Sequence, residues 1–278
     1  MSSGLPKDVC ARFAALRALN GSPPYIQQSD SLGILRQQLE EFYAYDEQNM
    51  PVLLGGITYL ESLLELCADI ISSAPVECKA LIESFIHDFP GVPNSNLAGR
   101  WSALGEACIA FKNAGSAKSV HGLWDAAKSI HLNFNEFLSG LLPFLVIGLH
   151  RASGTTASTK IFRAVYADKL DVLDQLTGGL NGKASPLLAL SHRAIRNAIS
   201  HADIYFDQAA GLVRYGVKQQ GLRLEETMHI HDFLLRAALY SHIPQAHLGA
   251  IAAAGLLMEG TTQDRARIRH ALVHRRLP

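Results

Sequence analysis

Apolar residues recur at helical intervals along most of this chain, and this spacing constrains the fold more than any other feature. The first clear examples cover residues 5–19 and 32–43, and Pro51 is expected to end the second helix. Further helices are expected over residues 52–71, 76–88, 97–113, 119–149 and 161–176, from Ser185 to Ile199, from Leu224 to Leu239, after Pro244 and at the end of the chain. The pattern predicts an all-α helical bundle.

One segment of the second half departs from helical spacing. β-Prone residues occupy positions 203–207 and 211–216, and glycines at 211 and 216 punctuate the second run. Short runs of this kind predict a small β-hairpin directly after His201.

A stretch of small polar residues divides the chain near its middle. It covers residues 153–159 and carries no helical pattern. We expect a domain boundary there, with an N-terminal helical region of unknown role over residues 1–152 and a second helical domain over residues 153–278.

Charge is balanced over the whole chain, so affinity for nucleic acid has to come from a local patch. The 278 residues include 25 basic and 25 acidic side chains. A basic segment lies at the end of the chain, where Asp264 alone opposes the arginines. Its basic and histidine residues are Arg265, Arg267, Arg269, His270, His274, Arg275 and Arg276. This segment predicts either a contact with an RNA backbone or a solvated basic face.

The sequence predicts a soluble, cytoplasmic protein. Its longest apolar run, residues 137–149, contains Ser139 and Pro143 and is shorter than the ~20 residues that span a bilayer. The first residues lack the basic-then-apolar order of a signal peptide. The four cysteines have no short paired spacing, which favours reduced thiols over a metal or redox motif.

The segment Arg196-Asn197-Ala198-Ile199-Ser200-His201 carries the groups that cleavage of an RNA phosphodiester requires. Arg196 supplies a permanent cation for the phosphorane, Asn197 a neutral amide, and His201 a group that transfers protons. Arg193 is expected to share a helical stripe with Asn197 and His201, because these positions are four apart. Arg196 and His201 are five apart and lie ~140° from each other around an ideal helix.

The same residues resemble the HEPN (higher eukaryote and prokaryote nucleotide-binding) domain superfamily. The pattern Arg-(Asn/Asp/His)-x-x-x-His near a helix end is followed here by Ala202-Asp203-Ile204-Tyr205-Phe206 and the predicted hairpin, and the resemblance covers residues 157–278. It implies a helical bundle that dimerises through the motif helices. Many members are metal-independent RNA endonucleases of toxin–antitoxin, abortive-infection and related defence systems, and others are non-catalytic.

The resemblance implies catalytic roles for Arg196, Asn197 and His201. RNA contacts are expected for Arg193 and for five residues of the terminal basic segment: Arg265, Arg267, Arg269, His270 and His274. Transesterification needs an acid and a base, and a homodimer or higher oligomer would bring two copies of the single motif histidine together. The expected partners are an RNA substrate, a second copy of the chain, and a cognate antitoxin or defence-complex subunit. No metal or other cofactor is expected, because no convincing ligand set is present.

Several alternatives stay open. Arg269-His270-Ala271-Leu272-Val273-His274 repeats the motif and is either a second catalytic motif or part of the basic face. His229-Ile230-His231-Asp232 suggests a metal site, but helical residues two apart point away from each other, which favours core or interface histidines. The whole chain is alternatively a non-catalytic HEPN-like interaction or regulatory subunit of a defence complex, or a nucleotide-binding module without hydrolysis.

Overall fold

The structure is a computed structural model that describes residues 31–48, 50–219 and 221–274. Its α-helices are α2 (Ser31–Gln48), α3 (Met50–Ser73), α4 (Pro75–Ile82), α5 (Ala98–Ser116), α6 (Val120–Ala152), α7 (Tyr166–Thr177), α8 (Ser185–Leu190), α9 (Arg193–Ser200), α10 (Ile230–Tyr240), α11 (Ile243–Glu259) and α12 (Thr262–His274). The 3-10 helices are η1 (Thr159–Arg163) and η2 (Gly179–Asn181), and the strands are β1 (Ile204–Asp207), β2 (Leu212–Gln219) and β3 (Leu222–His229). The mostly helical fold confirms the coarse prediction, and the helix expected over residues 5–19 lies outside the described residues.

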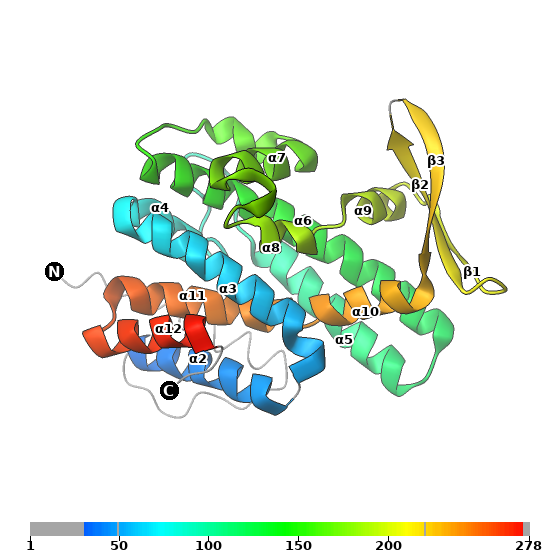
Figure 1. Ribbon diagram of the computed structural model, residues 1–278, viewed down its shortest axis with the longest axis horizontal. Coiled ribbons are helices and arrows are strands. Elements are labelled where there is room, and N and C mark those ends of the chain that lie inside the picture. Colours follow the sequence, from blue (N-terminus) through cyan, green and yellow to red (C-terminus); the bar gives the residue numbers. More distant parts are fainter. Residues whose placement is uncertain (1–30, 49, 220, 275–278) are drawn as a thin grey trace.

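The long helix α6 is the centre of the described structure (Figure 1). Ser119 begins it, because the Ser119 hydroxyl accepts a hydrogen bond from Gly122 N at 3.0 Å. The helix contacts α3, α4, α5, α7, α9 and α10. Neighbours on several sides bury nearly all of its second half, which explains the apolar run at residues 137–149.

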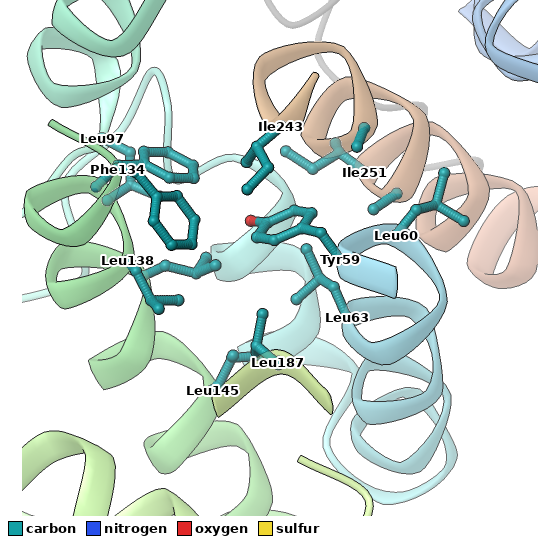
Figure 2. Close-up of a cluster of buried hydrophobic side chains, with 14 of the residues drawn as sticks. Tyr59, Leu60, Leu63, Leu97, Phe134, Leu138, Leu145, Leu187, Ile243 and Ile251 are labelled. Atoms are coloured by element: carbon teal, nitrogen blue, oxygen red, sulfur yellow. The ribbon is translucent and has the colours of Figure 1, made fainter. Parts of the chain in front are cut away.

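One hydrophobic core extends across the domain boundary expected at residues 152 and 153. Figure 2 shows side chains from both halves in this core, among them Tyr59, Leu138, Leu187 and Ile251. Helix α11 packs on α2 and α3, and a Cβ at Gly249 would lie 3.0 Å from Leu60. The division into residues 1–152 and 153–278 therefore does not separate two cores, since both halves bury the same apolar surface.

The sheet has the order β1-β2-β3 with antiparallel pairing throughout, and it includes the hairpin predicted after His201. Val213 and Tyr215 are buried on one face of β2. On the other face, a Cβ at Gly216 would lie 1.9 Å from Asp203 Oδ2. Arg223 of β3 pairs with the same carboxylate. Because Gly216 has no side chain, Asp203 and Arg223 can form an ion pair across β2.

The prediction of a helix that begins at Leu224 is wrong for its first residues. Residues 222–229 form β3, with Glu225 opposite Gly216, and α10 begins only at Ile230. Leu224 and Met228 are four apart and therefore fit a helix, but they also occupy alternate positions of a strand. Residues 222–229 form a strand because they pair with the backbone of β2, and this pairing cannot be read from the spacing of apolar residues.

The helix predicted over residues 185–199 is divided into α8 and α9 by tertiary hydrogen bonds. Tyr240 Oη donates to Leu190 O at 2.6 Å, and His192 N donates to Asn135 Oδ1 at 3.1 Å. These bonds satisfy backbone groups that a continuous helix would pair internally. The break therefore depends on residues far away in the sequence.

Two other predicted helices are shorter than expected. The segment 161–176 consists of the end of η1 and most of α7, because the backbone is extended at Val165. Helix α4 ends at Ile82, where the sequence predicts a helix to residue 88. Asp88 instead accepts hydrogen bonds from the backbone N–H groups of the following loop, at 2.9 and 2.8 Å.

Helix α6 is long and apolar enough to cross a membrane by length and composition. However, 83% of its apolar window is buried inside the protein. The core helix of a soluble protein passes the same test, and this burial is consistent with a soluble protein.

Two buried histidines should make stability depend on pH. Burial lowers the pKa of His131 and of His247 from 6.5 to about 3. Between these values the unfolded chain binds protons that the folded chain does not, so stability should fall as pH decreases below about 6.5. Each histidine should contribute a slope of up to about 1.4 kcal/mol per pH unit.

Urea unfolding between about pH 4.5 and about pH 6.5 measures this slope. His131→Phe should reduce it, whereas replacing the exposed His231 by Gln should not. The slope is read independently of each variant's absolute stability. An unchanged slope in His131→Phe would contradict the assignment.

Candidate functional site

Helix α9 packs one side against the rest of the chain and leaves several motif residues near the surface. Ile195 and Ala198 are buried, whereas Arg193 and His201 are exposed. His192 begins the helix, because its Nδ1 accepts a hydrogen bond from Ile195 N at 3.3 Å. Since α9 contacts α6 and β2, the motif lies between the central helix and the sheet.

The end of α9 is fixed by a left-handed residue, Ala202, with a φ of 52°. The N–H groups of Ala202 and Asp203 donate to the carbonyls of Ile199 and Ala198, at 3.1 and 2.7 Å. This is the Schellman arrangement that closes many helices, and it turns the chain toward β1. His201 therefore lies at the helix terminus, exposed to solvent.

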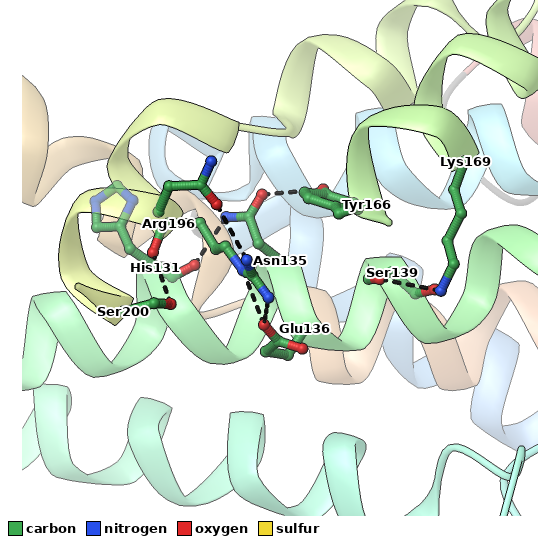
Figure 3. A network of polar contacts seen from close by, with 9 residues as sticks. His131, Asn135, Glu136, Ser139, Tyr166, Lys169, Arg196 and Ser200 are labelled. Carbon is green, nitrogen blue, oxygen red and sulfur yellow. Dashed lines mark hydrogen bonds and ion pairs between the residues drawn. The ribbon is translucent and has the colours of Figure 1, made fainter. Parts of the chain in front are cut away.

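Arg196 is held by a carboxylate of the central helix that sequence reasoning missed. Its Nε donates to Glu136 Oε1 at 2.8 Å, its Nη2 contacts the same oxygen, and its Nη1 donates to Asn197 Oδ1 at 3.0 Å (Figure 3). The side chains of Arg196 and Glu136 are 27% and 36% exposed, so the pair lies at the surface. These contacts occupy three of the five guanidinium N–H groups.

Within one chain the predicted catalytic groups do not form a single cluster. Arg196 and Asn197 are joined, but no hydrogen bond in the described part of the chain links the His201 side chain to either of them. Glu136 turns the Arg196 guanidinium toward α6. His201 instead follows the last turn of α9, as expected for positions ~140° apart on a helix.

A buried polar network lies beneath α9 and fixes its position. Asn135 of α6 is fully buried. Its Oδ1 accepts hydrogen bonds from Tyr166 Oη at 3.0 Å and from His192 N at 3.1 Å, and its Nδ2 donates to His131 O at 2.8 Å. Figure 3 shows Asn135 and Tyr166 beside the Arg196–Glu136 pair. One amide side chain thus links α6 to α7 and to the start of α9.

Burial disfavours the charged forms of Tyr166 and His192. It raises the pKa of Tyr166 and lowers the pKa of His192. Sequence reasoning did not identify these residues. The sequence signal that could have found the network is the pair of polar residues Asn135 and His131 within an apolar helix, because buried polar groups need hydrogen-bond partners.

The part of the predicted RNA-binding segment that forms α12 lies far from α9, and Arg275 and Arg276 lie outside the described residues. Helix α12 is next to α11, and Figure 1 shows it at the opposite side of the molecule from α9 and the sheet. Arg265 Nε donates to Leu257 O at 3.1 Å, and Arg267 Nη1 donates to Glu40 Oε1 at 3.0 Å. These two arginines therefore already bind groups of their own chain.

The rest of the second Arg-x4-His pattern is also on α12. Arg269 is exposed, His270 is half-buried, and His274 is the last residue of the helix. Because α12 and α9 lie apart, a single chain does not bring the two Arg-x4-His patterns together.

The residues that could hold a metal are dispersed. In the ranges the structure describes, no three His, Cys, Asp or Glu side chains are grouped to hold an ion. His231 is exposed rather than buried, and its Nδ1 lies 3.6 Å from Asp232 Oδ1. Cys67, Cys78 and Cys108 are free thiols.

Comparisons of the chain with protein-family models, with curated proteins and with solved structures find no match. The HEPN resemblance therefore stays a prediction that depends on residues 196–206.

The Asn135 network should contribute strongly to stability. Asn135→Ala would leave the Tyr166 hydroxyl and the His192 N–H without their buried acceptor, and should lower the free energy of unfolding by about 2–4 kcal/mol. Asn133→Ala is the matched control, because Asn133 Nδ2 bonds to Ser129 O within the same helix. That control should lose less than about 1 kcal/mol in urea unfolding. Equal losses in the two variants would argue against the network.

Proposed function

We propose that this protein is a metal-independent RNA endonuclease of the HEPN type that acts as a homodimer. The observation that carries the proposal is the arrangement at the end of α9. An exposed imidazole lies at the helix terminus, and five residues earlier a half-buried guanidinium is held by Glu136 and Asn197 through three of its five N–H groups. Arg196, Asn197 and His201 are the proposed catalytic residues.

The proposed reaction is an internal transesterification. The 2′-oxygen attacks the adjacent phosphorus, a new P–O2′ bond forms, and the P–O5′ bond breaks. One His201 accepts the proton of the 2′-hydroxyl, and a second donates a proton to the departing 5′-oxygen. The products are a 2′,3′-cyclic phosphate and a 5′-hydroxyl. Two histidines act in one cleavage, which is why the proposal includes a second copy of the chain.

Arg196 is proposed to stabilise the charge on the phosphorane. Glu136 fixes one edge of its guanidinium, so the remaining N–H groups are oriented before a substrate arrives. The motif predicts that Asn197 orients His201 or the phosphate. Because its Oδ1 accepts from Arg196 Nη1, Asn197 is instead proposed to orient this guanidinium or the phosphate. Arg193 is exposed on the preceding turn and is proposed to contact the RNA backbone.

The proposed biological role is a toxin or effector of a bacterial defence or toxin–antitoxin system. It rests on the HEPN resemblance, and a cognate antitoxin or complex subunit is the proposed regulatory partner. The basic residues of α12 are proposed to bind RNA only where a second copy brings them near the cleaved strand. Arg265 and Arg269 are both exposed, and Arg265 is bonded to Leu257 O, so Arg269 is the first candidate.

A second candidate function is a non-catalytic interaction subunit of a defence complex. The ion pair between Arg196 and Glu136 favours it, because the carboxylate offsets the charge that a phosphate would require. In this case α9 and the exposed residues of the sheet, including Leu222 and Leu224, would form a subunit interface.

RNA cleavage in the presence of EDTA tests the leading proposal. His201→Ala and Arg196→Ala should each reduce cleavage by about 100-fold or more, because each removes a group that acts in the transition state. His231→Ala is the matched control, since His231 is an exposed histidine on α10. It should cleave RNA like the unaltered chain.

Folding should be nearly unchanged in both catalytic variants. His201 is exposed, and loss of the surface pair with Glu136 should cost about 1 kcal/mol or less. Full cleavage by His201→Ala and Arg196→Ala would exclude this site. An unaltered chain that does not cleave RNA but forms a stable complex with a defence subunit would favour the second candidate.

A further inference from the structure

Three neighbouring positions on one side of α6, residues 136, 139 and 140, each contact a cationic side chain from a different helix. Glu136 meets Arg196 of α9, Ser139 meets Lys169 of α7, and Gly140 meets Arg100 of α5. Positions 136, 139 and 140 lie on the same side of a helix because they are three and four apart. Figure 3 shows Arg196, Glu136, Ser139 and Lys169 in one row along α6. The cationic band consists of these three side chains: Arg100, Lys169 and Arg196.

The band is built by specific contacts. Lys169 Nζ donates to Ser139 O at 3.0 Å and lies 3.3 Å from Ser139 Oγ. A Cβ at Gly140 would lie 2.5 Å from Arg100 Nη1 and 3.0 Å from Arg100 Cδ. The absence of a side chain at position 140 therefore allows Arg100 to lie directly against α6.

The band carries more positive than negative charge. Glu136 is bonded to Arg196, and it is also the carboxylate that acts on Lys169. Burial and the charge of Arg100 lower the pKa of Lys169 to about 8, and Glu136 opposes this only in part. Like charges held together destabilise each other, and an anion bound between them would remove that cost.

We propose that the cationic band binds a phosphodiester phosphate of the RNA, next to the phosphate that is cleaved at Arg196 and His201. This inference rests on the proposed function and specifies how the same site holds its substrate. Arg100 is exposed and would contact the phosphate directly, as a planar guanidinium with several donors. Lys169 is 5% exposed and would act as a charge behind it.

The spacing of the band fits a strand that runs along α6. The levels of Glu136 and Gly140 differ by one helical turn, about 5–6 Å. Figure 3 places Ser200, Arg196 and Lys169 in this order along the helix. A strand with one phosphate at Arg196 would therefore extend its next phosphates toward Arg100 and Lys169.

RNA binding by chains that also carry His201→Ala, so that the strand stays uncut, tests the band. Fluorescence anisotropy with a short fluorescein-labelled single-stranded RNA is the readout. Arg100→Gln and Lys169→Met should each weaken binding by about tenfold. Arg100→Gln should also lower the salt dependence of log Kd by ~0.7, the value for one lost phosphate contact on a single strand.

Lys128→Met is the matched control for these variants. Lys128 lies on α6 and pairs with Asp125, more than two turns before Glu136, so its loss should leave binding unchanged. Lys169→Arg keeps the charge and should restore most of the affinity lost in Lys169→Met. Because Arg100 is exposed, Arg100→Gln tests the band even where Lys169→Met disturbs packing.

A pKa measurement separates a binding role from a purely structural one. The charged groups acting on Lys169 are Arg100 of α5 and Glu136 of α6. Bound RNA should raise the pKa of Lys169 from about 8, as followed by the 13Cε shift of labelled lysine. Affinity should correspondingly fall as pH increases from about 7 to about 9, and Lys169→Met should lose this dependence.

The outcomes distinguish this inference from the proposed function. Normal RNA binding by both Arg100→Gln and Lys169→Met would overturn the band, even where His201→Ala abolishes cleavage. Undiminished cleavage by His201→Ala alone would overturn the catalytic assignment, and the band would then be tested with a 2′-O-methyl RNA, which cannot undergo transesterification. Displacement of the RNA by equimolar inorganic phosphate would assign the band to a free phosphate ion and would overturn the inference.

Discussion

The buried amide of Asn135 sets the position of α9, which carries the motif residues of the functional proposals. A fully buried amide has to be paired within the protein, and Asn135 meets this need with a tyrosine of α7, the backbone of His192 and the carbonyl of His131. The bond to His192 N replaces an intrahelical bond and stops the preceding helix. As a consequence, α9 runs in a different direction from α8. Arg196 of α9 then lies opposite Glu136, the residue that follows Asn135 in α6.

Much of the helical framework followed from spacing in the sequence, because an amphipathic pattern records which side of a helix is buried. The pattern predicted α2, α3, α5, α6 and α11 within a few residues. It failed where two periods fit the same residues, as at Leu224 and Met228, and where a distant group broke a helix, as Asn135 does at His192. A boundary drawn at residue 153 from local composition likewise gave no information on the shared core.

For the candidate site, the sequence supplied the residues of the motif but not the groups that hold them. Arg196, Asn197 and His201 stand out because their chemistry is close together in the chain. Glu136 is 60 positions from Arg196 in the sequence, and no local pattern connects the two. The same is true of the contact between Arg100 and Gly140, which depends on the packing of α5 against α6.

The ion pair between Arg196 and Glu136 would have two opposite consequences for the proposed catalysis. It orients the guanidinium and so lowers the entropy lost when a phosphate binds, but the carboxylate also offsets the charge that attracts the phosphate. At 27% and 36% exposure, solvent screens the pair, so an incoming phosphate competes with a weakened attraction. In the proposed complex, the charges of Arg100 and Lys169, about one turn further along α6, would offset the repulsion between Glu136 and the strand. A single carboxylate can therefore fix the arginine without excluding the substrate, provided that the neighbouring cations stay charged.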